Sequence, residues 1–324
     1  MQDFLFSVNA VAPIILMVLL GYLLKRIGLF SKDVASKLNK VVFRVLIPAM
    51  LMLNIYKIEL GTKIDPTFII YGIAVDLVLF ALLFYPFCRM LPKKSQRGVM
   101  LQTIFRSNYA LIGLPITISL CGDLGAIYAT IMGAATIPVF NVLAVFCLSI
   151  FSGKKADYKS ILLGILKNPL ILGVAAGGAL LGIRYIFVQT GITFRLTDIQ
   201  PVYKVLSDLS AISTPVALLC LGANFEFSAI PALKKQILLG VGTRNFFTPI
   251  VGLGLALLLG CFEAAHFAVF IALFATPLAV STVPMAQEMD GDTELAGQIL
   301  VFSTITSAFT MFLATYVLRL LGVF

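Results

Sequence analysis

Residues 105–115 of the chain read FRSNYALIGLP and lie inside a hydrophobic run over residues 98–121. The proline at position 115 removes one backbone donor of a helix and frees a carbonyl group one turn earlier. In hydrocarbon such groups need partners, so an interrupted helix is tolerated only where it is buried in protein or lines a cavity. The stretch therefore predicts a transmembrane helix broken near Pro115. The N–H groups that open the following half-helix suit a carboxylate.

A second stretch has the same character. Residues 275–284 read ATPLAVSTVP and lie inside the run 264–286, where Pro277 and Pro284 predict another break. Neutral hydrogen-bonding side chains flank the two breaks: Asn108 and Tyr109 at the first, Ser281 and Thr282 at the second. Simple proline kinks, with their backbone groups bonded to nearby hydroxyls, are the alternative. The matching positions of the two breaks favour a crossover that binds a ligand.

The composition of the whole chain places both stretches in a membrane. Of its 324 residues, 60% are hydrophobic and 12% are charged, whereas a soluble domain is about 45–50% apolar and about 25% charged. We expect an all-α integral membrane protein in the lipid bilayer. Its ten transmembrane helices are expected near residues 5–27, 40–56, 67–88, 98–121, 125–151, 161–187, 202–224, 236–259, 264–286 and 295–321. The net charge of +9 then reports topology and not nucleic-acid binding.

Landmarks in the first half of the chain recur in the second half. The matched pairs are Pro13 and Pro169, Pro48 and Pro215, Pro115 and Pro284, and Gly122 and Gly291. Their offsets are 156, 167, 169 and 169 residues, as expected for two homologous halves with small insertions. The halves are residues 1–152 and 161–324, each with five helices. Because five is an odd number, the second half enters the membrane inverted, which is typical of secondary transporters with a substrate site near the midplane.

The distribution of basic residues predicts the orientation. Sixteen Lys and Arg residues fall in the turns after the odd-numbered helices and six on the opposite side, leaving out Arg106 and Arg244 inside helices. Basic loops stay inside. We expect a multi-pass protein of the cell's inner (plasma) membrane with both termini outside. The first apolar run is long enough to span and lacks a basic start, so it is expected to be a retained helix and not a cleaved signal peptide.

The sequence lacks the residues that several kinds of chemistry require. The five cysteines are scattered without a CxxC pair, and His266 is the one histidine. A disulfide framework or a histidine-based metal site is therefore not expected. The sequence has no GxSxG, HExxH or Walker A pattern. We expect no metal, no cofactor and no enzymatic activity.

A few polar side chains lie inside the apolar runs. Asp76 is a functional candidate, because a charge at that depth is costly; it would support the crossover or carry a coupling proton, and a structural ion pair is the alternative. Arg106 would attract an anion or extend to the inner surface, and Arg244 is expected to extend to that surface. Asn141 would face the site or join helices.

The motif Asn108-x4-Gly113-x-Pro115 followed by Gly122-Asp123 resembles the auxin efflux carrier family. That family includes the plant PIN carriers and bacterial permeases proposed for malate or malonate. The resemblance implies a scaffold of helices 1, 2, 6 and 7, often a homodimer, and a moving transport part of helices 3–5 and 8–10. It implies elevator-type alternating access, with helices 4 and 9 crossing near the midplane. It also implies that Asn108 donates to a substrate carboxylate and that Asp76 supports the crossover.

The sequence thus predicts a secondary active or facilitative transporter of small organic anions. The expected substrate-binding residues are Asn108, Tyr109, Pro115, Asn141, Pro277, Ser281, Thr282 and Pro284. A sodium- or proton-coupled transporter or antiporter of the bile-acid symporter class is the main alternative. An antiporter usually needs paired carboxylates at the crossing, and Asp76 is the one obvious candidate. A channel and a membrane enzyme are further alternatives, which the inverted repeat and the missing catalytic motifs disfavour.

Overall fold

The computed structural model describes residues 2–58, 66–152 and 166–324. Within these residues the chain is helical and has no strand beyond one isolated bridge. The α-helices are α1 (Gln2–Arg26), α2 (Lys32–Val41), α3 (Ile47–Tyr56), α4 (Thr67–Met90), α5 (Lys94–Phe105), α6 (Leu114–Phe151), α8 (Pro169–Gln189), α9 (Gln200–Asn224), α10 (Ile230–Gly242), α11 (Thr248–Leu259), α12 (Ala264–Phe270), α13 (Thr282–Glu288) and α14 (Thr293–Leu320). Single π-helical turns are η1 (Val42–Leu46), η2 (Tyr109–Gly113), η5 (Thr243–Phe247) and η6 (Ile271–Ala275), and short 3-10 turns are η3 (Leu196–Asp198) and η4 (Phe227–Ala229).

Seven of the described helical stretches are long and apolar enough to cross a membrane. The run Ala264–Ala275 is apolar but shorter. One of the seven, Tyr109–Phe151, is not a straight rod, because Gly122 turns the chain with φ 56° and ψ −139°. This turn falls between the two helices expected at 98–121 and 125–151. The expectation of an all-helical membrane protein is confirmed; the plan of ten helices in two inverted repeats stays a prediction.

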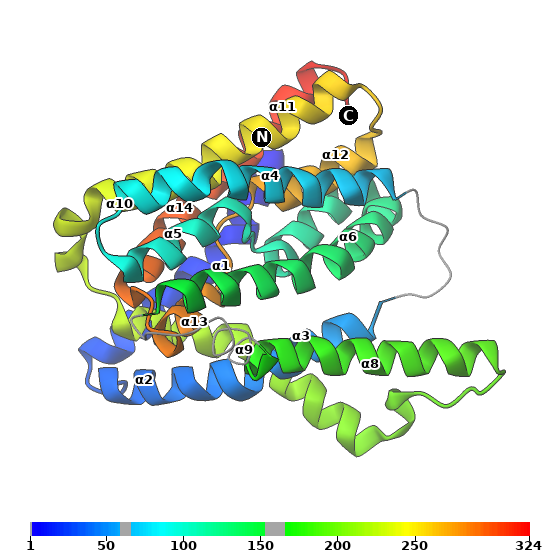
Figure 1. Cartoon of the computed structure of the whole chain (residues 1–324), viewed down its shortest axis with the longest axis horizontal. Helices are drawn as coiled ribbons and strands as arrows, with labels where there is room; N and C mark the ends of the chain where they lie inside the picture. The colour runs from blue at the N-terminus through cyan, green and yellow to red at the C-terminus, as the bar shows by residue number, and fades with distance from the viewer. Residues whose placement is uncertain (1, 59–65, 153–165) are drawn as a thin grey trace.

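The helices pack in two groups that meet along the cavity described below (Figure 1). In one group α3 packs on α8 and α9, and α1 packs on α9. In the other group α12 and α5 pack on α6, and α10 packs on α14. α1 also contacts α14 and so joins the two groups. Close contact between α1 and α9 depends on glycine, since a methyl group at Gly21 or Gly222 would collide with backbone carbonyls of the facing helix.

The two helices expected to be broken are broken, and their irregular segments lie side by side. One segment is residues 106–108, between α5 and η2, and the other is residues 276–281, between η6 and α13. Asn108 N–H donates to Pro277 O at 2.8 Å, and Ala279 N–H donates to Arg106 O at 3.1 Å. This short antiparallel pairing satisfies backbone groups that lipid cannot satisfy.

The positions of the breaks differ from the expectation based on proline. Pro277 lies within its break, but helical turns resume at Tyr109, ahead of Pro115, and at Thr282, ahead of Pro284. Pro115 lies at the start of α6 and Pro284 in the first turn of α13. Pro284 lies in a first turn, where the N–H it lacks would have no partner. Pro115 follows the π-helical turn η2, which closes with Leu114 N–H donating to Tyr109 O. Pro115 and Pro284 therefore follow the breaks and do not form them.

Candidate functional site

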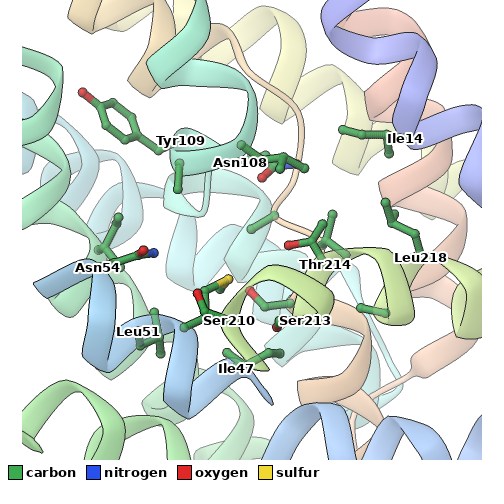
Figure 2. Close-up of a pocket in the computed structure, with 18 of the residues that line it drawn as sticks. Ile14, Ile47, Leu51, Asn54, Asn108, Tyr109, Ser210, Ser213, Thr214 and Leu218 are labelled. Carbon is green, nitrogen blue, oxygen red and sulfur yellow. The ribbon is translucent and has the colours of Figure 1, made fainter. Parts of the chain in front are cut away.

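A cavity of about 650 Å³ lies beside the crossing of the two broken helices (Figure 2). One wall is the crossing itself, with residues 106–111 and 279–281 and, from α6, Ile137, Phe140 and Asn141. The opposite wall comes from the middle of α1, from α3 and from α9. It includes Ile14, Ile47, Leu51, Asn54, Ser210, Ser213, Thr214 and Leu218. The cavity is therefore mostly apolar, with polar groups gathered at the crossing and along α9.

Arg106 is the one charged side chain among the described residues that line the cavity. It is 2% exposed, so it does not extend to the membrane surface. Its Nη1 donates to Gln102 Oε1 at 2.6 Å and contacts Met285 Sδ, and its Nη2 donates to Asn141 Oδ1 at 3.1 Å and Ser281 Oγ at 2.9 Å. These partners are all neutral. The crossing thus holds a guanidinium without a carboxylate partner in the described chain.

Asn108 lies at the crossing with its side chain in the cavity wall (Figure 2). It is 7% exposed, and its Nδ2 has no hydrogen-bond partner among the described residues. Its backbone is fixed by the bond to Pro277. A buried amide donor without a partner, on a fixed backbone, is a group ready to bind an acceptor from a ligand.

The remaining expected site residues divide into two sets. Tyr109, Asn141 and Ser281 line the cavity, although the Tyr109 hydroxyl already donates to Ala129 O at 2.9 Å. Asn141 and Ser281 reach the cavity as partners of Arg106. The residues that do not line it are Asp76, Pro115, Pro277, Thr282 and Pro284. None of these three prolines therefore faces the cavity.

Arg244 occupies the other side of the crossing. It is fully buried, and the expectation that it extends to the inner surface is wrong. Its guanidinium donates to Ile104 O at 3.2 Å, Leu273 O at 2.8 Å and Phe274 O at 2.6 Å. These carbonyls belong to the last turns before the two breaks. Because helix carbonyl ends carry partial negative charge, Arg244 ties the two half-helices together.

Asp76, in the middle of α4, acts electrostatically on Arg244. It is 1% exposed, and neither carboxylate oxygen has a hydrogen bond within the described chain. Asp76 therefore lies outside the cavity, like Arg244. Groups of three or more His, Cys, Asp or Glu side chains that would hold a metal ion are not found among the described residues.

The wall formed by α9 was not anticipated from the sequence. Ser210, Ser213 and Thr214 face the cavity around Pro215 (Figure 2). Ser213 Oγ is buried and has no partner in the described part of the chain. Three hydroxyl side chains close to a proline within an apolar helix are a signal in the sequence for this wall. The proline, Pro215, is also the counterpart of Pro48 in the repeat.

A helical membrane protein with a cavity where two broken helices meet, and with polar groups gathered at that crossing, has the architecture of a membrane transporter. The model of the family described as "Membrane transport protein" matches residues 6–315, and the chain belongs to that family. The resemblance to auxin efflux carriers is thereby confirmed. A protein of Methanothermobacter thermautotrophicus described as an uncharacterized transporter is 24% identical over 327 residues, which cover 97% of this chain and 99% of that protein.

Proposed function

We propose that the protein is a carrier of small organic anions, chiefly carboxylates, and that the substrate binds in the cavity at the crossing. The observation that carries this proposal is Arg106, a buried guanidinium in the cavity wall whose hydrogen-bond partners in the described chain are neutral. An uncompensated buried charge is costly, and an anion entering the cavity would offset that cost. The unpartnered amide of Asn108 would donate a second hydrogen bond to the carboxylate.

The same proposal assigns the halves of the chain to an inverted repeat of ten helices. Helices 1, 2, 6 and 7 correspond to α1, α2 with α3, α8 and α9, and would form the scaffold. The rest of the chain would form the transport part and carry the crossing. Packing between α3 and α8 and between α1 and α9 supports this division, as does the cavity between these helices and the crossing. Elevator-type movement would carry Arg106 and Asn108 past a fixed wall.

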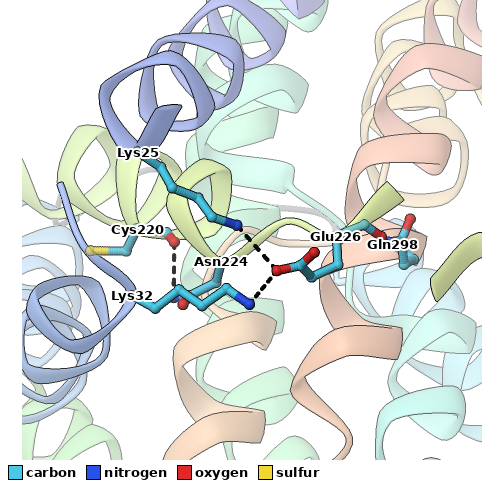
Figure 3. A network of polar contacts seen from close by, with 6 residues as sticks. All are labelled: Lys25, Lys32, Cys220, Asn224, Glu226 and Gln298. Carbon is cyan, nitrogen blue, oxygen red and sulfur yellow. Dashed lines mark hydrogen bonds and ion pairs between the residues drawn. The ribbon is translucent and has the colours of Figure 1, made fainter. Parts of the chain in front are cut away.

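Contacts at one end of the molecule would hold it in a single state. Gln287 of α13 bonds Asn39 and Ser36 of α2, and Arg44 pairs with Glu288 at 3.4 Å. Lys25 and Lys32 both pair with Glu226, whose backbone oxygen accepts a bond from Gln298 of α14 (Figure 3).

That end carries the basic turns and would face the cytoplasm, with both termini outside in the cell's inner membrane. The cavity extends in the other direction, to Asn54 near the end of α3. The arrangement supports a state closed to the inside and reached from the outside.

A sodium- or proton-coupled transporter or antiporter is the second candidate. The observation in its favour is Asp76, buried without a hydrogen bond in the described chain. Against the antiporter form stands the cavity lining, which includes no carboxylate among the described residues. Coupling by a proton at Asp76 remains compatible with an anion carrier, because Asp76 lies outside the cavity.

Uptake by proteoliposomes tests the proposal. Purified protein would be reconstituted, and uptake of radiolabelled mono- and dicarboxylates measured at two pH values, with and without sodium, against protein-free liposomes. Saturable uptake of at least one acid is the expected result, and its dependence on pH and sodium would identify the coupling. A sodium flux that needs no organic anion would support the antiporter. Absence of uptake of every acid by folded protein would overturn the carrier proposal.

A further inference from the structure

Three charged side chains are buried in the interior of the described chain: Asp76, Arg106 and Arg244. His266 is buried too, but its Nδ1 accepts a hydrogen bond from Glu263 N–H at 3.2 Å. His266 does not line the cavity. Which of the three charges lines the cavity decides the charge that a solute there must bring.

Asp76 and Arg244 lie outside the cavity lining. Arg244 is held by the carbonyl oxygens of Ile104, Leu273 and Phe274, to which it donates. The carboxylate oxygens of Asp76 form no hydrogen bond within the described chain. A solute in the cavity therefore contacts neither side chain.

Arg106 has no carboxylate partner in the described chain. The titratable group that acts on it is the thiol of Cys147, and its hydrogen-bond acceptors are an amide oxygen of Gln102, an amide oxygen of Asn141 and the hydroxyl of Ser281. No other Lys, Arg, His, Asp or Glu is among the described residues that line the cavity. The described lining therefore carries a single positive charge, which one negative charge on the solute would neutralise.

A second negative charge on the solute would find no further cationic side chain among the described residues of the lining. The wall facing Arg106 consists of apolar side chains such as Ile14, Leu51 and Leu218, with neutral hydroxyls and amides between them. Neutral donors would relieve part of the cost of a second carboxylate, but transfer of a net charge into such a space is disfavoured in a low dielectric.

We propose that the cavity selects organic anions with one negative charge and a neutral, largely apolar remainder, and that Arg106 determines this selection. The inference rests on the proposed carrier function and adds the charge of the substrate to it. Arg106 would be a specificity-determining residue that touches the substrate.

Acids that differ in charge but share a carbon skeleton test the inference. The probes are succinate and monomethyl succinate, glutarate and monomethyl glutarate, and suberate and monomethyl suberate. All are applied to the reconstituted protein at pH 7.5, where both carboxyls of the diacids are ionised. The measurement is uptake, or inhibition of the uptake of an acid already shown to be carried. We expect the monoester to half-saturate the protein at a concentration at least about tenfold lower than its diacid.

Variants at the two arginine positions sharpen the result. Arg106→Lys keeps the charge and should keep the preference, whereas Arg106→Gln should abolish it. Arg89, exposed in the last turn of α4, gives the matched control Arg89→Gln, which should behave as wild type.

Each outcome bears on a different claim. Equal or tighter binding of the diacids by wild-type protein would overturn the inference while leaving the carrier function standing. The same follows if Arg106→Gln, shown to be folded, retains the preference. Failure of every acid, in either form, to be taken up or to compete would overturn the proposed function and the inference with it.

Discussion

The backbone N–H of Asn108 donates to the carbonyl oxygen of Pro277 at 2.8 Å, joining two helix breaks that lie in opposite halves of the chain. This bond and its partner from Ala279 to Arg106 form the isolated bridge at the centre of the fold. Because both breaks are fixed by each other, the side chains that follow them point into the cavity with little freedom. Binding of a ligand would then cost less ordering of the protein than it would at a loop.

Removal of the Asn108 amide should weaken binding without unfolding the protein. Asn108→Ala deletes a donor that has no partner in the described chain but leaves the backbone bonds. A hydrogen bond to a charged group contributes about 1.5–3 kcal/mol, so we expect KM for uptake to rise by about tenfold or more. Asn224→Ala is the control, since that amide bonds Cys220 O at the far end of α9. An unchanged KM in Asn108→Ala would remove this residue from the site.

Arg244 should contribute to stability through both half-helices and through Asp76. Arg244→Gln leaves three buried carbonyls with weaker partners and strands the Asp76 carboxylate. Breaking one partner of a buried pair costs about 3–5 kcal/mol, and we expect a clear fall in the thermal midpoint of detergent-solubilised protein.

The pairing itself is measured by a double-mutant cycle. Adding Asp76→Asn to Arg244→Gln removes the stranded charge, so the double variant should be less destabilised than the two single effects combined. Strict additivity would show that Asp76 and Arg244 act independently and would contradict the charge balance at the crossing.

The contact between α1 and α9 should tolerate no side chain at Gly222. A methyl group there would overlap the carbonyl oxygen of Val18 and force the helices apart. We expect Gly222→Ala to destabilise the protein by about 1–3 kcal/mol. Gly178→Ala, on a part of α8 with nothing within 4 Å, is the control and should be neutral or stabilising by up to about 1 kcal/mol. Equal effects at both positions would contradict the close packing of α1 on α9.

The ion pairs of Glu226 should make a small, pH-dependent contribution. Lys32 and Lys25 hold the pKa of the Glu226 carboxyl below its ordinary value of 4.5. The stabilisation is therefore present above that value and is lost as pH falls through the lowered pKa. We expect Glu226→Gln to lower stability at pH 7 by less than about 1 kcal/mol, because the pair is partly exposed.

Thermal unfolding of both proteins at pH 7 and pH 3.5 checks the effect of Glu226. The difference between wild type and Glu226→Gln should shrink at the lower pH. Glu294→Gln, at an exposed carboxylate, is the control and should show no such trend. A difference of the same size at both pH values would show that the ion pairs do not stabilise the fold.

The sequence indicated where the two helices are interrupted, but it indicated less about the contacts that stabilise the interrupted segments. Proline, glycine and polar residues in apolar runs led to both irregular segments, because lipid tolerates such backbone in few places. The first break lies at 106–108, seven residues or more ahead of Pro115, and the π-helical turn η2 separates the two. Proline therefore indicated the neighbourhood of each break and not its position.

The directions of the buried arginine side chains were harder to predict from the sequence than the positions of the breaks. Arg106 and Arg244 lie at similar distances from basic turns in the sequence, and a long side chain can extend either to the surface or inward. The structure turns both inward: Arg106 to the cavity and Arg244 to the carbonyls of Ile104 and Phe274. The wall from α1, α3 and α9 depends on packing between distant helices, and the hydroxyl side chains beside Pro215 are the signal of it that the sequence carries.

The central claim is that the Arg106 guanidinium binds the transported anion, and transport current measures it most directly. Proteoliposomes on a solid-supported membrane would receive a jump in the concentration of an acid that the wild-type protein carries. We expect a saturable current in wild type and in Arg89→Gln, and a smaller current of much lower affinity in Arg106→Gln, with the folded protein confirmed by thermal unfolding. A current of wild-type size and affinity in Arg106→Gln would contradict the account.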